Sequence, residues 1–313
     1  MAQNDTNSHD EQGALTTLSP AKRRLIQAHE QIVHQKPDRS DFLHTVMCQV
    51  GMPRKATDAR VFERQSGPFS ILLEAGKLWN GRAWIEQPLP YGTTPRLVMV
   101  HLSSEAIRTR SRTIELGSSI RQFLQALGMQ TNGGARGGYT MLRKQIEALA
   151  ACRLLIGMQA EGKVINVDAK PIKKFEAWYQ PDDSQPTLWP GVLELSQEFY
   201  DTLTQHAVPL DYRALAALKH SSLGLDIYTW LAHRLCRIKI SGGVFLSWDN
   251  LREQFGQEYS TSKNFKHEFR DVLRQVLLVY PNARIEEVDG GIRLYESPPP
   301  ISQKPANMLA SSW

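Results

Sequence analysis

Cysteine is scarce in this chain, and its distribution excludes a fold held together by disulfides. The 313 residues contain three cysteines, Cys48, Cys152 and Cys236, which are odd in number and far apart. They form no Cys-x-x-Cys pair and lack histidines at zinc-ligand spacing. No apolar run approaches the roughly 18 residues that span a bilayer. The N-terminus is polar and acidic, unlike a signal sequence. We therefore expect a soluble, cytoplasmic protein that does not enter a membrane.

The motifs of several enzyme classes are also missing. No Gly-x-x-x-x-Gly-Lys-Ser/Thr loop occurs, which argues against a nucleotide-hydrolysing motor. The glycine-rich stretch 133–138 lacks the following Lys-Ser/Thr and is interpreted as a flexible loop. His29, Glu30 and His34 resemble a zinc-protease motif, but the two histidines are one residue too far apart to share a helix face. The sequence also lacks the His-x-His pair that is typical of a metal-dependent nicking enzyme. We expect neither an enzyme, nor a cofactor, nor a metal site.

Charge is only slightly unbalanced. Lys and Arg number 37 against 32 Asp and Glu, which gives a formal net charge of +5. This excess permits a nucleic-acid partner but is equally compatible with an ordinary, slightly basic protein. DNA binding has to be argued from the placement of the cations.

Composition divides the chain into five parts. Residues 1–64 are expected to be partly disordered, with a short helix over 20–34. Two structured segments follow, at 65–180 and 188–296, and the Pro- and Asp-rich stretch 181–187 is typical of a linker. Residues 297–313 are rich in proline, which interrupts helices and sheets, and we expect a tail.

The second structured segment has a clear local pattern. A helix is predicted over 225–238, and another begins at Ser247, whose side chain suits an N-cap. A longer helix begins near Ser262, because Phe265, Phe269, Val272 and Val276 recur at helical spacing. Two short strands, 284–288 and 292–295, flank the turn Asp289-Gly290-Gly291 and predict a hairpin.

The first structured segment repeats this order. It has a helix at about 104–110, a short helix after the serine pair 118–119, and a helix from Thr140 with Leu142, Ile146 and Leu149 on one face. A hairpin over 155–157 and 163–167 follows. Helix, helix, turn, helix and hairpin is the order of a winged helix, and the segments align with a longer loop in the first. We therefore predict an α+β, mostly helical fold with two tandem winged-helix domains, although short apolar matches also arise by chance.

Cations gather on the last helix and hairpin of each segment, where a winged helix contacts DNA. The alternative interpretation is a solvated face that keeps a core helix soluble. The predicted DNA-binding residues of the first segment are Arg136, Thr140, Arg143, Lys144, Lys163, Lys173 and Lys174. Those of the second segment are Lys263, Lys266, His267, Arg270, Arg274, Arg284 and Arg293.

Two motifs carry a resemblance to a known family. They are PYG-x-x-PRL-x-x-x-HL-x-S-E-A over residues 90–106 and LG-x-S-I-x-x-F-L-x-x-LG over 116–128. The chain resembles, over roughly residues 65–295, the plasmid-encoded RepA replication initiators of broad-host-range plasmids. The resemblance implies two fused winged-helix domains that bind repeated sites, called iterons, in the double-stranded DNA of a plasmid origin.

The same resemblance implies melting of adjacent AT-rich DNA and recruitment of the host replicative helicase and the host initiator protein. It also implies a homodimer that represses the gene and a monomer that activates replication, but no catalytic residues. A winged-helix transcriptional regulator without an initiation role is the alternative. A primase or nicking enzyme is a third hypothesis, which the missing motifs disfavour.

Overall fold

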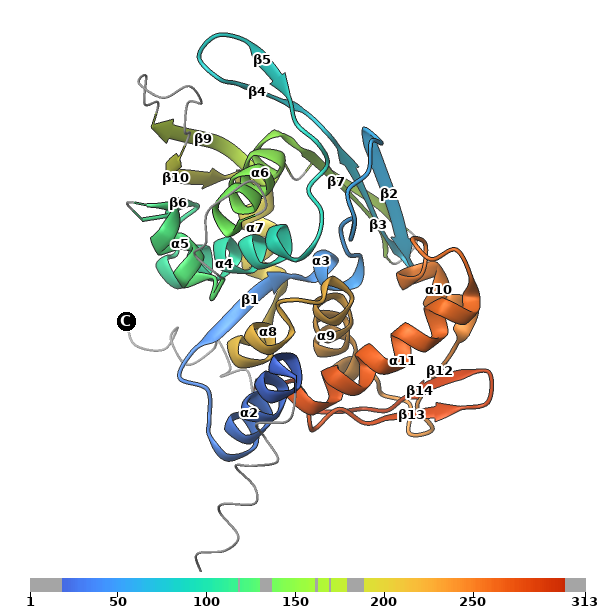
Figure 1. Cartoon of the computed structure of the whole chain (residues 1–313). Helices are drawn as coiled ribbons and strands as arrows, with labels where there is room; N and C mark the ends of the chain where they lie inside the picture. Colours follow the sequence, from blue (N-terminus) through green and yellow to red (C-terminus); the bar gives the residue numbers. More distant parts are fainter. Residues whose placement is uncertain are drawn as a thin grey trace, which may run out of the picture.

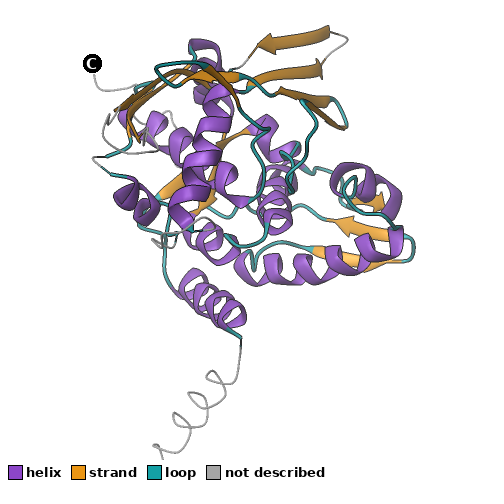
Figure 2. Ribbon diagram, turned by 45° about the horizontal axis from the view of Figure 1, so that its top comes forward, coloured by secondary structure: helices purple, strands orange, loops and turns teal. Residues whose placement is uncertain are grey.

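The computed structural model describes residues 19–117, 119–129, 137–160, 163–168, 170–178 and 189–301. Within these residues the protein is α+β, with helices at its centre and several small sheets around them (Figures 1 and 2). The first described helix, α2 (Pro20–His34), confirms the helix predicted over 20–34. The Ser19 side chain caps its N-terminus by accepting a hydrogen bond from the Lys22 amide, and Pro20 occupies the first turn.

A pair of antiparallel strands joins the first half of the molecule (residues 19–178) to the second half (189–301). Strand β1 (Ser40–His44) pairs with β11 (Ala207–Asp211), with Phe42 opposite Pro209. Each strand leads directly into a helix, α3 (Thr45–Gln49) after β1 and α8 (Tyr212–Leu218) after β11. The sequence did not predict this pairing, because the two strands lie far apart along the chain.

The first half contains the long helix α4 (Thr93–Thr109), β6 (Thr113–Glu115), α5 (Ile120–Ala126) and α6 (Gly138–Ala151). The prediction of a helix at 104–110 was too short, since α4 begins at Thr93. Helix α4 is buried on nearly all sides, so its apolar residues form no single stripe that a periodicity search detects. The predicted serine cap of α5 is confirmed at Ser119, which accepts from the Gln122 amide.

The hairpin predicted after α6 exists but belongs to a larger sheet. Strands β7 (Arg153–Ala160) and β8 (Lys163–Asp168) pair with each other. Strand β7 also pairs with β3 (Phe69–Glu74), which in turn pairs with β2 (Val61–Ser66). The resulting order is β2-β3-β7-β8. A further hairpin, β4 (Lys77–Trp79) and β5 (Trp84–Glu86), extends away from the other elements at the top of Figure 1.

One three-stranded sheet contains the strands that precede and follow the predicted linker. Strands β9 (Ile172–Trp178) and β10 (Trp189–Leu195) are antiparallel neighbours, and β6 pairs with the other edge of β10. The stretch 181–187 lies outside the described residues, and it connects two strands of one sheet. The division of the chain into two domains there stays a prediction. Helix α7 (Gln197–His206) follows β10, with Ser196 as its N-cap.

The second half matches its predicted elements closely. Helix α9 (Ser222–Arg234) and the short 3-10 helix η1 (Leu235–Arg237) precede β12 (Val244–Ser247), α10 (Trp248–Phe255) and α11 (Ser262–Val279). Strands β13 (Ile285–Val288) and β14 (Gly291–Leu294) form the predicted hairpin, and β12 joins it in the order β12-β14-β13. Ser247 caps α10, as predicted. Ser297, the first residue of the predicted tail, is buried and donates its amide to the Leu235 carbonyl, and residues 302–313 lie outside the described residues.

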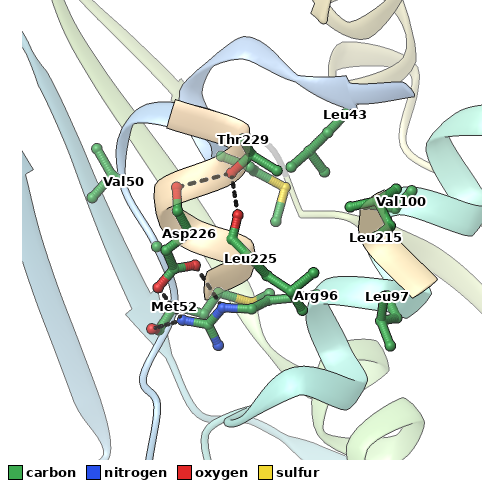
Figure 3. Close-up of a pocket in the computed structure, with 12 residues that line it drawn as sticks. Leu43, Val50, Met52, Arg96, Leu97, Val100, Leu215, Leu225, Asp226 and Thr229 are labelled. Carbon is green, nitrogen blue, oxygen red and sulfur yellow. Dashed lines mark hydrogen bonds and ion pairs between the residues drawn. The ribbon is translucent and has the colours of Figure 1, made fainter. Parts of the chain in front are cut away.

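A buried ion pair connects the two halves in the interior of the molecule. The guanidinium of Arg96 on α4 binds both carboxylate oxygens of Asp226 on α9, at 2.6 and 2.8 Å (Figure 3). Arg96 also donates to the carbonyls of Met52, Pro53 and Gly92. The adjacent cavity of about 20 Å³ is mostly apolar. It has room for about one water molecule, so it is a packing space rather than a ligand site.

Candidate nucleic-acid interface

Helix α11 is shaped by one strongly apolar face. Thr261 caps its N-terminus by accepting from the Asn264 amide at 3.2 Å. Phe265 and Phe269 are fully buried, with ring centroids 5.5 Å apart, and Trp248 and Phe255 of α10 pack against Phe269. These aromatic contacts fix how α11 is rotated about its axis, so its polar residues face away from the core.

The predicted cations of α11 fall into two groups on that outward side. Lys263, His267 and Arg274 are exposed. Lys266 and Arg270 instead lean over Trp248, with their charged groups 6.0 and 4.7 Å from the ring centroid. Trp248 itself is only 6% exposed. Lys266 and Arg270 therefore combine a packing role with a charge near the surface.

Acidic side chains lie close to the basic residues in the middle of this helix. Arg270 pairs with Glu287 of β13, at 2.6 Å from its Nε. Arg274 donates to Asp271 at 2.7 Å, and His267 lies 3.5 Å from the same carboxylate. No ion pair with a described residue involves Lys263 or Lys266. The cations best placed to meet phosphates are therefore those of the first turns of α11, a distinction that spacing alone did not reveal.

The β13–β14 hairpin holds its two predicted residues in local contacts. Arg284 lies just before β13, with its guanidinium 5.5 Å from the Tyr295 ring centroid. Arg293 donates to the Gly242 carbonyl at 3.1 Å. The tight turn of this hairpin is close to the start of α10, because the Trp248 amide donates to the Gly290 carbonyl. Arg284, at the base of the hairpin, is at the opposite end from that turn.

The predicted residues of the first half are divided among three elements. Thr140 and Arg143 are half-buried on α6, and Lys144 is exposed there. Burial raises the pKa of Glu147, one turn further along, while Arg143 and Lys144 oppose this shift. Arg136 lies outside the described residues.

Lys163 begins β8 in the four-stranded sheet, whereas Lys173 and Lys174 belong to β9 in the three-stranded sheet. The structure thus separates Lys163 from the other two lysines, although the sequence placed all three along one wing. The difference arises because β8 pairs with β7, and β9 pairs with β10.

The two halves share one order of elements. Helices α4, α5 and α6 with strands β6, β7 and β8 follow the same sequence as α9, α10 and α11 with β12, β13 and β14. The sheets differ, because β12 pairs with the hairpin that follows its own α11, whereas β6 pairs with β10. The second half is therefore the more regular unit.

Sequence reasoning missed one exposed feature of the surface, the β4–β5 hairpin. Trp79 and Trp84 are 52% and 66% exposed, which is unusual for side chains of this size. The signal was present in the sequence as Trp-Asn-Gly-Arg-Ala-Trp, where Asn-Gly between aromatic residues is typical of a tight hairpin turn.

Neither a cluster of metal ligands nor a membrane span is found in the described part of the chain. No three His, Cys, Asp or Glu side chains gather there as metal ligands would. None of its helices is both long enough and apolar enough to cross a membrane.

These features define a class of α+β protein with a doubled order of elements and a cationic helix at its surface. The family model described as "Plasmid encoded RepA protein" matches residues 89–250, which is more than half of the chain. The chain belongs to this RepA family. The match includes both motifs that carried the resemblance, at 90–106 and 116–128, and ends before α11. Neither the curated proteins nor the solved structures compared with the chain gave a match.

Proposed function

We propose that this protein initiates replication of a plasmid by binding repeated sites in the duplex DNA of its origin. Membership of the RepA family supports a role in plasmid replication initiation. The observation that carries the DNA-binding part is α11, whose first turns carry the exposed Lys263 and the half-buried Lys266 while its aromatic face is buried. Each half is a winged helix in this proposal, with α6 and α11 as the helices that enter the major groove.

The contacts in the second half favour α11 as the main reading helix. Helix α10 packs against it, and the Arg270–Glu287 pair ties the β13–β14 hairpin to the helix. A recognition element needs this kind of support, because base contacts depend on a fixed orientation of the helix. Arg143 and Lys144 of α6 would supply the corresponding contacts of the first half.

Melting and recruitment complete the proposed mechanism. Protein bound to successive repeats strains the duplex, and AT-rich steps deform at lower cost than others. Binding energy alone supplies this work, so no hydrolytic site is needed. The melted segment would then receive the host replicative helicase with the help of the host initiator protein. A monomer would activate the origin, and a homodimer would repress the gene.

The decisive experiment measures binding to duplex origin DNA as a function of salt. Each phosphate contact contributes about 0.9 to the slope of log K against log salt. The double variant Lys263→Ala/Lys266→Ala should therefore reduce the slope by about 2 and weaken binding. Lys36→Ala, an exposed cation just after α2, is the matched control and should leave the slope unchanged. Equal slopes for the wild type and the double variant would remove α11 from the interface.

A transcriptional regulator without an initiation role is the competing function. Footprinting separates the two, since an initiator protects several repeats beside an AT-rich block, whereas a regulator protects a single operator at its own promoter. A plasmid that carries the origin but lacks this gene should fail to replicate. Normal maintenance of that plasmid would overturn the proposal.

A further inference from the structure

The β4–β5 hairpin presents two large aromatic rings to solvent on one side of a two-stranded ribbon. Trp79 and Trp84 are directly opposite each other, with ring centroids 5.7 Å apart and planes inclined by 57°. The ribbon extends away from the other elements (Figure 1). It also lies outside residues 89–250, so the family match does not account for it.

The hairpin is hydrogen-bonded at both ends. At its tip, the Asn80 side chain accepts from the amides of Arg82 and Ala83, both at 2.9 Å. At its base, Arg60 donates to the carbonyls of Gln87 and Ala75, and the Gln87 amide donates to Gly76. These bonds keep the tryptophans in place without burying them, because they bind only the two ends of the ribbon.

Close packing anchors the base of the hairpin to α6. A Cβ atom at Gly76 would lie 2.1 Å from the Ala151 carbonyl oxygen, so the two backbones touch here. The hairpin therefore begins at the C-terminal end of the helix that carries Arg143 and Lys144, both proposed to contact DNA.

The charges around the two rings are cationic or neutralised. Arg82 is exposed at the tip. The one carboxylate of the ribbon, Glu86, pairs with Lys77 at 3.3 Å and with Arg60 at 4.0 Å. An anionic strand therefore meets a free cation and no unpaired acid on this ribbon.

We propose that the β4–β5 hairpin binds unpaired bases of single-stranded DNA by stacking them on Trp79 and Trp84. Exposed aromatic rings beside a cation are the usual means by which proteins hold single strands without sequence preference. A base inside a duplex is covered on both faces by its neighbours, so the rings select opened DNA. The inference rests on the proposed function, and it assigns to this hairpin the task of holding a strand after melting.

The test measures binding of a fluorescein-labelled 20-nucleotide oligothymidylate by fluorescence anisotropy, in parallel with duplex origin DNA. Trp79→Ala/Trp84→Ala should weaken oligothymidylate binding by at least about 30-fold, the lower bound for two lost stacks. Its affinity for duplex origin DNA should stay unchanged. Trp79→Phe/Trp84→Phe should retain most of the affinity, because phenylalanine also stacks. Phe245→Ala removes an aromatic ring that is 45% exposed on β12 and serves as the matched control.

Two outcomes would overturn the inference. In the first, the wild-type protein fails to bind oligothymidylate although it binds duplex origin DNA. In the second, the alanine variant binds oligothymidylate as the wild type does; if that variant also loses self-association in sedimentation, the rings are a contact between copies of the chain. Failure of the wild-type protein to bind duplex origin DNA would instead refute the proposed function. If alanine unfolds the protein, Trp79→Leu/Trp84→Leu keeps apolar side chains without planar rings and should show the same loss.

Discussion

The Arg96–Asp226 pair is where a single substitution should test how the two halves are joined. Both side chains are 7% exposed, and Arg96 reaches from α4 to α9. Asp226→Asn keeps the shape of the side chain but replaces one accepting oxygen by an amide that faces the guanidinium. Arg54, whose Nε is 3.9 Å from Asp226, loses the same negative charge. Glu258 then remains as the carboxylate close to Arg54 and Arg64.

The size of the effect follows from leaving buried cations without their partner. Removal of one member of a buried ion pair costs about 3–5 kcal/mol. For a chain of 313 residues the unfolding entropy near the midpoint is roughly 0.66 kcal/mol per degree, from ~2.1 cal/mol/K per residue. Asp226→Asn should therefore lower the midpoint of thermal unfolding by about 5–8 °C.

The assay is thermal unfolding followed by circular dichroism. Glu296→Gln is the matched control, because Glu296 pairs with Lys239 at 2.8 Å on the surface. A surface pair contributes about 1 kcal/mol or less, so the control should shift the midpoint by no more than about 2 °C. A similarly small shift for Asp226→Asn would refute the argument that this pair holds α4 against α9.

Three further predictions concern pH, capping and the link between helix and hairpin. Burial lowers the pKa of His44 and of His233 to about 4. Below their ordinary pKa of ~6.5 the unfolded chain therefore binds more protons than the folded one. Each histidine should lower the free energy of unfolding by about 2 kcal/mol at pH 5. Urea titrations at pH 7.5 and 5 check this. His44→Asn, which can still cap α3, should reduce the loss by about 2 kcal/mol, and an undiminished loss contradicts the argument. Thr261→Ala should destabilise the protein by about 1 kcal/mol through the lost cap of α11, measured by the same titration, and no change would show that the cap is dispensable. Arg270→Met keeps an apolar side chain beside the indole but leaves Glu287 without its cation. The variant should change the free energy of unfolding by less than about 1 kcal/mol and should weaken duplex DNA binding in anisotropy assays. Unchanged binding would exclude a role for this pair at the interface.

Local pattern was sufficient for the C-terminal helices and hairpin of the second half, but not for the elements between β10 and α8. Phe265 and Phe269 recur at helical spacing, Ser247 suits a cap, and Asp289-Gly290 suits a tight turn, so α10, α11 and the hairpin were predictable. Each of these signals depends on residues within a few positions of one another. The same reasoning failed for the start of α4, because a helix buried all around has no polar face to reveal its period.

The sequence by itself determined α2, the two C-terminal helices and the hairpin of each half, and the family, through motifs at 90–106 and 116–128. The tertiary structure decided which strands pair, and so placed Lys163 in a different sheet from Lys173. It also decided that Arg270 is held by Glu287, and that two tryptophans stay exposed on the β4–β5 hairpin. These outcomes depend on contacts between distant parts of the chain, which local periodicity does not encode.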